Sequence, residues 1–242
     1  GSHLPQQRFM GQMTLPRELS IRNGRLCQQP VRELEHYRVN KTGYQNVMMT
    51  GETSLQGING RFIDMTVTVR PGNEDSMYRW FKINVARDGE HFTSIRFKPA
   101  TGIIRIDRTQ SGLPCDIVNV REFPAHAVDG KLKLRLILDR YSVELFVNDG
   151  EQAATSVIYT PLDAKSISFS CDGTVLVDVE KYVAHIMPGI VDASADDSYL
   201  QAQAVALRTK VYYAMGDATV IQASDLEFQY YTEEDYIAKW GR

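Results

Sequence analysis

The side chains that could do acid–base or metal chemistry in this sequence are few. His185 could move a proton, because imidazole titrates near neutral pH, although a lone histidine beside apolar neighbours more often packs, and we favour packing. Asp192, Asp196 and Asp197 could bind a cation, but a solvated loop that begins a helix explains them better. No cysteine or histidine spacing is typical of a zinc site, so we expect no metal and no cofactor.

Cysteine count and net charge narrow the class of protein. Cys27, Cys115 and Cys171 are an odd number in a chain of 242 residues, which predicts reduced, buried thiols. A net charge of −3 and the lack of a long apolar run lead us to expect neither a nucleic-acid nor a membrane partner. Gly1–His3 resemble the scar of a cleaved tag and no signal peptide is seen, so the bacterial cytoplasm and secretion both stay open.

From about residue 16 to 180, apolar and polar residues alternate with the period of a strand. Predicted strands occupy 63–69, 80–86, 94–97, 102–108, 131–138, 156–159, 166–170 and 174–179. Turn signals separate them, among them Asp88-Gly89 and Asp172-Gly173. This pattern predicts a mainly β fold, an antiparallel two-sheet β-sandwich of the jelly-roll or concanavalin-like kind.

Residues 138–150 form the most informative strand and turn. Alternation places three apolar and three polar side chains on opposite faces: Val143, Leu145 and Val147 against Ser142, Glu144 and Asn148. We therefore expect one buried face, followed by an Asp-Gly turn.

After about residue 183 the period becomes helical. Apolar residues recur at steps of three or four over 200–215, and Gly216 follows as a terminator. Residues 183–242 hold four basic and nine acidic side chains, a net of −5. We expect a tag and leader at 1–8, the β-sandwich at 9–181, and a short C-terminal α-helical segment at 182–242.

Four motifs in order resemble the C-terminal β-sandwich of glycoside hydrolase family 32, which includes invertases, levanases and sucrose-6-phosphate hydrolases. They are Gly11–Leu19, a linker strand at 24–34, Gly102–Arg108 with Ser111-Gly112, and residues 138–150, and the stretch Thr155–Pro161 completes the set. The resemblance covers about residues 9–181. It implies a β-fructofuranosidase parent in which a catalytic propeller domain is the partner of this sandwich.

The resemblance also implies that this chain is not itself catalytic. Family 32 enzymes use an aspartate nucleophile and a glutamate acid/base, and both lie in the propeller. Their Asn-Asp-Pro, Glu-Cys and Arg-Asp-Pro motifs do not occur here. The nearest fragment, Arg87-Asp88, is followed by Gly89 in a turn.

A binding role is the positive expectation, because the sandwich is similar to fructan-binding modules of carbohydrate-binding module family 66. That similarity implies a fructan or sucrose-type ligand held by carboxylates and guanidinium groups. The candidate contacts are Asp107, Arg108, Glu144 and Asn148, followed by Arg105 and Trp80 as a fork and an aromatic platform. The competing interpretation, which we favour, is that these polar residues hold turns and strand ends or face the propeller. Trp80 then belongs to the core.

The tail resembles a second family, the stage II sporulation protein D proteins, which act on peptidoglycan glycan strands. The likeness runs from Glu180 and is most specific at 201–209, Q-A-Q-A-V-A-L-R-T. Ile190 stands where that family has its catalytic glutamate, and an aliphatic side chain cannot donate a proton. A sporulation-type protein associated with glycan and a chimeric protein without activity of its own both stay open as alternatives.

Overall fold

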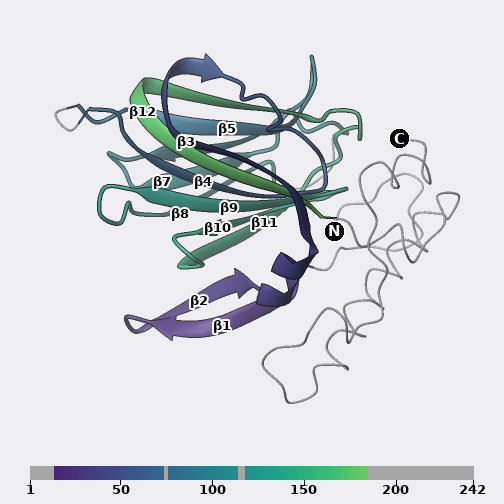
Figure 1. Ribbon diagram of the computed structural model, residues 1–242, viewed down its shortest axis with the longest axis horizontal. Coiled ribbons are helices and arrows are strands. Elements are labelled where there is room, and N and C mark those ends of the chain that lie inside the picture. Colours follow the sequence, from purple (N-terminus) through teal and green to yellow (C-terminus); the bar gives the residue numbers. More distant parts are fainter. Residues whose placement is uncertain (1–13, 74–75, 114–117, 185–242) are drawn as a thin grey trace, which may run out of the picture. The chain divides into compact units, whose positions relative to one another are not determined.

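The computed structural model describes residues 14–73, 76–113 and 118–184, most of which are strand (Figure 1). The helical stripe, His185, the aspartates at 192–197 and Cys115 lie outside the described residues. The strands are β1 (Arg17–Arg22), β2 (Arg25–Pro30), β3 (Arg38–Thr53), β4 (Ile63–Pro71), β5 (Trp80–Arg87), β6 (Thr93–Lys98), β7 (Ile103–Asp107), β8 (Val120–Pro124), β9 (Leu132–Asp139), β10 (Ser142–Val147), β11 (Gln152–Val157) and β12 (Ser166–Ala184). The mainly β prediction is confirmed. Within these ranges, no helix has the length and hydropathy to cross a membrane.

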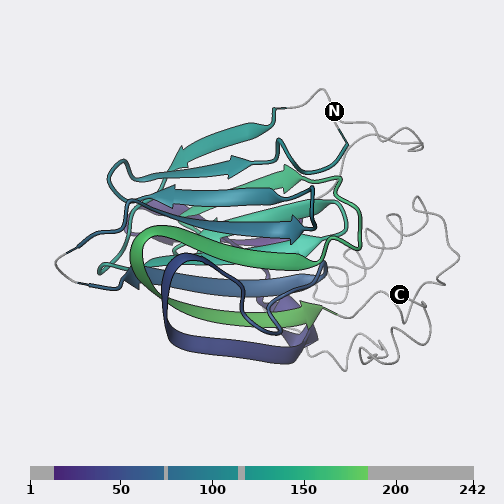
Figure 2. The same cartoon turned by 90° about the horizontal axis from the view of Figure 1, so that it is seen from above.

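Strand β12 joins the two halves of one antiparallel sheet. The strand order is β11-β10-β9-β4-β12-β5-β6-β7-β8, and β3 also pairs with β12. Residues 166–172 of β12 pair with β5, whereas residues 175–183 pair with β4. Because one bent strand serves both halves, the sheet curls back on itself, as the green strand shows in Figure 2. The predicted antiparallel sandwich is therefore present.

The predicted turn at Asp172-Gly173 is wrong, since β12 continues through it. Gly173 has a φ of +110°, and a Cβ there would lie 3.0 Å from the Cα of Tyr78. Glycine tolerates this positive φ and the close approach of the segment around Tyr78. It therefore bends the strand without ending it.

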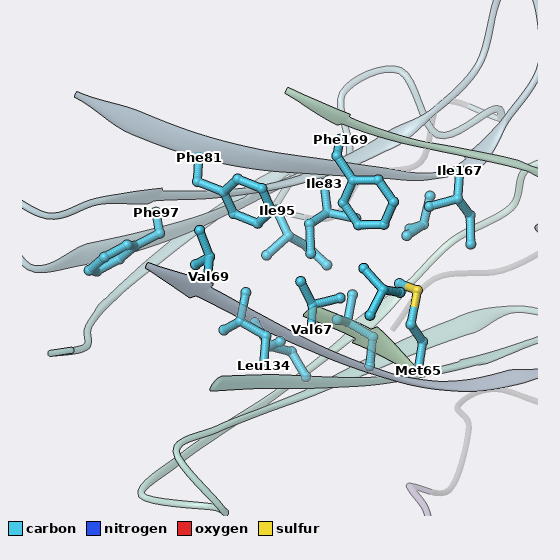
Figure 3. Close-up of a cluster of buried hydrophobic side chains, with 14 of the residues drawn as sticks. Met65, Val67, Val69, Phe81, Ile83, Ile95, Phe97, Leu134, Ile167 and Phe169 are labelled. Atoms are coloured by element: carbon cyan, nitrogen blue, oxygen red, sulfur yellow. The ribbon is translucent and has the colours of Figure 1, made fainter. Parts of the chain in front are cut away.

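The core lies between the two halves and holds the apolar members of the alternating strands. In Figure 3, one set of side chains from β4 and β9 faces another from β5, β6 and β12: Met65, Val67, Val69 and Leu134 opposite Phe81, Ile83, Ile95, Phe97, Ile167 and Phe169. The rings of Phe81 and Phe169 stack with centroids 6.4 Å apart. Full burial of each such side chain contributes about 1.5–3 kcal/mol, which makes this the main stabilising layer.

The prediction of a single buried face on β10 is wrong. Val143, Leu145 and Val147 face the core as expected, but Glu144 and Phe146 on the opposite side are only 3% and 2% exposed. At the end of β10, the β1–β2 hairpin lies against the following turn (Figure 1). Alternation within β10 does not predict the burial of Glu144 and Phe146.

Main-chain and side-chain hydrogen bonds attach the hairpin to the turn after β10. The Gln28 N–H donates to the carbonyl of Gly150 at 2.9 Å, and the Gln29 side chain donates to the carbonyl of Asp149 at 2.7 Å. Arg22 also donates to the carbonyl of Asp149. Residues 19–29, which include the first part of the linker, thus belong to the same structural unit as the 138–150 motif.

Residues 14–18 and 30–39 belong to a second compact unit. There the predicted linker strand is wrong beyond Pro30, because Arg32–Tyr37 form a 3₁₀ helix (η1). Proline has no N–H to continue a strand ladder. The Arg32 guanidinium binds the Glu18 carboxylate at 2.8 Å and 3.0 Å.

The Asp88-Gly89 turn between β5 and β6 supplies a pH-dependent prediction. The Asp88 carboxylate accepts the backbone N–H groups of His91 and Glu90, both at 2.7 Å, and pairs with the His91 ring. The His91 and Glu90 N–H bonds and the His91 ring lower the pKa of Asp88 to about 2. Because the folded pKa lies below the ordinary 3.8, the stabilisation is complete above that value and is lost as the pH falls toward 2.

We expect an NMR titration of the Asp88 carboxyl carbon to have its midpoint near 2. Asp88→Asn is expected to remove this part of the acid dependence of stability. A midpoint at the ordinary value of 3.8 would contradict the hydrogen-bonded turn.

Candidate functional site

The side of strands β12, β5, β6, β7 and β8 that points away from the core carries a grid of polar side chains, which we call the polar face. It arises because alternate residues of each strand point to opposite sides, and the other set fills the core. Strand register places the polar side chains in two adjacent rows: Ser170, Lys82, Arg96, Arg105 and Glu122 in one, and Ser168, Asn84, Ser94 and Asp107 in the other.

Arg105 lies at the centre of an ion-pair cluster on this face. Its Nη2 is 3.1 Å from Oδ2 of Asp107, and its Nη1 is 3.5 Å from Oε1 of Glu122. The three side chains are 35%, 28% and 53% exposed, respectively. A guanidinium fork and two carboxylates are therefore held in place while they remain open to a ligand.

Asp107 is kept ionised by its surroundings. Burial raises the pKa of this carboxyl, but hydrogen bonds from Thr109 and the Arg105 guanidinium outweigh burial and hold the pKa below its ordinary value. The Thr109 N–H donates to Oδ1 at 3.0 Å. A carboxyl with a lowered pKa is a poor proton donor at neutral pH and a good acceptor of hydroxyl hydrogen bonds.

Trp80 lies on the same half of the sheet but away from Asp107. It begins β5 and is partly exposed, with Nζ of Lys82 5.6 Å from its ring centroid. Asn84, four residues further along β5, is level with Asp107 in the register. Four residues of strand span about 13 Å, so Trp80 is not level with Asp107; it lies two residues from Lys82, which is in register with Arg105.

Arg108 is next to Asp107 in sequence but does not belong to the polar face. It is 3% exposed, and its guanidinium carbon is 5.8 Å from the centroid of the Tyr159 ring. Its backbone also closes a turn, because its carbonyl accepts the Ser111 N–H at 2.9 Å. Its contacts are those of a residue that supports the turn after β7.

Glu144 and Asn148 lie in the other half of the sheet. Glu144 is buried and accepts the Thr155 hydroxyl at 3.4 Å. Asn148 has a φ of +47°, donates to the carbonyl of His126 at 2.7 Å, and accepts the Lys133 N–H at 3.2 Å. The structure therefore brings Arg105 and Asp107 together and places Glu144 and Asn148 elsewhere: Glu144 bonds across to β11, and Asn148 bonds within the turn after β10.

Sequence reasoning did not identify Lys82, Arg96, Asn84 or Glu122 as members of the site. The sequence shows that these residues alternate with apolar ones, which predicts a polar face on each strand. What joins them to Arg105 and Asp107 is the register across four strands. A single strand does not reveal that register.

A family model described as "Glycosyl hydrolases family 32 C terminal" matches residues 33–185. A levanase of Bacillus subtilis (strain 168) is 28% identical over 186 residues, which are 72% of this chain and 27% of that protein. A raffinose invertase of Escherichia coli is 33% identical over 170 residues, which are 66% of this chain and 32% of that protein. These two relatives and two sucrose-6-phosphate hydrolase relatives are matched over only 27% to 34% of their length.

Solved structures agree on the fold. An exo-inulinase from Aspergillus awamori superposes with a TM-score of 0.62 at 21% identity, over 75% of this chain and 37% of that one. Fructan 1-exohydrolase IIa from Cichorium intybus gives 0.61 at 19% identity, over 71% and 40% of the two chains.

A second model, "Stage II sporulation protein", matches residues 170–240 and overlaps the first. The overlap includes residues 170–184, which form most of β12. These residues pair with β4 and β5 at the centre of the sheet. The first part of the second match is therefore built into the sandwich.

Proposed function

The chain belongs to the C-terminal domains of glycosyl hydrolase family 32, and on that premise we propose that it is the non-catalytic β-sandwich of a β-fructosidase. In this proposal it supports a catalytic domain and contacts fructoside substrate through the polar face. The observation that carries the proposal is the partly exposed Arg105 guanidinium, which pairs with Asp107 on one side and Glu122 on the other.

The state of the carboxylates on the polar face supports the proposed non-catalytic role. A glycosidase needs one protonated carboxyl as acid and a second, ionised carboxylate. On the polar face, Asp107 and Glu122 both pair with Arg105, and the pKa of Asp107 is lowered. Elsewhere, Glu144 is 3% exposed and beyond the reach of a polymer chain.

Fructoside binding is supported by the geometry of the Arg105 cluster. Planar guanidinium and carboxylate groups bind vicinal hydroxyls in pairs of hydrogen bonds, and they do so best when neighbours fix their orientation. Asp107 and Glu122 fix the orientation of Arg105 in this way. The levanase and exo-inulinase relatives point to levan and inulin as the ligands to test.

Titration calorimetry with levan, inulin and sucrose tests the proposal. We expect saturable binding of at least one of them and no release of fructose. Arg105→Ala is expected to weaken binding about tenfold or more, because a charge-assisted hydrogen bond contributes about 1.5–3 kcal/mol. Binding should persist to pH 5, since Asp107 stays ionised there.

Arg121→Ala is the matched control for this experiment. Arg121 is exposed on β8, one residue before Glu122, so its side chain points to the opposite side of the strand. Its removal should leave affinity unchanged. No binding heat with any of the three ligands, or equal weakening by both substitutions, would contradict a sugar site at Arg105.

A further inference from the structure

Three cations stand in one cross-strand row of the polar face. Lys82 is directly opposite Arg96, and Arg96 is directly opposite Arg105. Like charges that face each other across a sheet destabilise it. The row therefore lowers stability, and the packing of the core on the other side of these strands does not require it.

Arg96, in the middle of the row, is the cation whose positive charge is least balanced by its neighbours. Arg105 pairs with Asp107 and Glu122, and Lys82 lies over the Trp80 ring. Arg96 is half-buried between them, and no carboxylate in the described part of the chain pairs with it. Positive charge is thus concentrated at Arg96 and the neighbouring Lys82.

Buried neutral groups with unused hydrogen-bonding capacity lie next to these cations. Ser170 is opposite Lys82, and Asn84 is two residues along the same strand. Asn84 Nδ2 donates to the Ser168 hydroxyl at 3.3 Å. Its Oδ1, and the hydroxyl of Ser170, are buried without a hydrogen-bond partner in the protein. Such atoms are stabilised when water or a ligand hydroxyl reaches them.

A strained backbone also occurs beside Asn84. The pairing of β5 with β12 shifts register between Ser166 and Ser168, and Ala86 has a φ of +48°. Such an interruption of the ladder changes the direction of the side chains around it. It lies at the end of the row that contains Asn84 and Ser168.

We propose that the polar face binds a phosphate group between Lys82 and Arg96. Neighbouring strands are about 4.8 Å apart, so one tetrahedral oxyanion can accept hydrogen bonds from both cations at once. Arg96 presents a planar fork and Lys82 a point charge, a combination that suits phosphate. Asn84 and Ser170 then bind hydroxyl groups of a phosphate ester. This site adjoins the proposed fructoside contact, since Arg96 is directly opposite Arg105, but phosphate binding at Lys82 and Arg96 does not require a fructoside.

The full chain should be titrated with inorganic phosphate in chloride buffer at constant ionic strength. We expect saturable binding by calorimetry and a rise in Tm that increasing chloride alone does not reproduce. Arg96→Gln is expected to weaken phosphate binding at least tenfold while the ligand-free Tm stays equal or rises, because a like-charge contact is removed. Arg121→Gln, which removes the same charge from the opposite side of β8, should change affinity less than twofold.

A second arm uses fructose 6-phosphate to separate free phosphate from a phosphate ester. Tighter binding of the ester, reduced by Ser170→Ala, supports an ester ligand, whereas equal affinity supports free phosphate. Equal weakening by Arg96→Gln and Arg121→Gln, or no saturable binding in either arm, would overturn the proposal. The inorganic phosphate titration contains no sugar, so a failure of levan binding leaves its result unaffected.

Discussion

Gly150→Ala is expected to destabilise the sandwich by about 3 kcal/mol, through backbone strain together with a main-chain clash. Gly150 has a φ of +91°, a conformation that a side chain rarely adopts. A Cβ there would lie 2.1 Å from the carbonyl oxygen of Gln28 and 2.6 Å from its carbonyl carbon. The obstacle is main chain and cannot rotate away. Relief therefore requires loss of the 2.9 Å hydrogen bond from the Gln28 N–H to Gly150.

Gly130→Ala provides the control for this substitution. Gly130 also has a left-handed φ, +73°, but nothing lies within 4 Å of a Cβ placed there. Gly130→Ala therefore measures only the free energy lost when alanine adopts a positive φ, which is about 1 kcal/mol. Urea denaturation of the two variants measures the difference. Equal losses of unfolding free energy would show that the β1–β2 hairpin is not held against the turn after β10.

Arg135→Met is expected to lower the free energy of unfolding by about 3–5 kcal/mol, because it leaves a buried carboxylate without its guanidinium. Arg135 binds Asp64 through two parallel bonds, Nε to Oδ1 at 2.9 Å and Nη2 to Oδ2 at 2.7 Å. The two side chains are 14% and 7% exposed. This pair joins β9 to β4 on the side of the sheet opposite the core.

Lys133→Met tests whether burial is the cause of that loss. Lys133 lies on the same strand, two residues earlier, and its Nζ is 2.7 Å from Asp149. Both members of this pair are nearly half exposed, at 47% and 45%, so the expected loss is at most about 1 kcal/mol. Asp64→Leu combined with Arg135→Met should recover much of the stability lost in the single variant. A loss for Arg135→Met no larger than that for Lys133→Met would show that the pair contributes little.

Local sequence determined the strands and the core. Alternation over 63–69, 80–86 and 131–138 identified side chains that do face the core, because the side-chain direction in a strand repeats every two residues whatever the strand pairs with. The same rule placed Arg105 and Asp107 on one face of β7, and these are the two candidate sugar contacts that the structure brings together. The family motifs likewise pointed to the sandwich that the family match and the fold show.

Only the tertiary structure decided which polar residues share a site. Register across strands joined Lys82 and Arg96 to Arg105, and no single strand encodes its register. A hairpin more than a hundred residues away holds the turn after Glu144 and Asn148. Asp172-Gly173 is a dipeptide typical of a turn, yet it lies inside the bent strand β12. Glycine permits a turn and a bent strand alike, and the packing of the segment around Tyr78 selects the strand. Sequence thus determined the direction in which each side chain points, because that direction depends on the adjacent residues of the same strand. The groups that surround each side chain are distant in sequence, and only the tertiary structure brings them together.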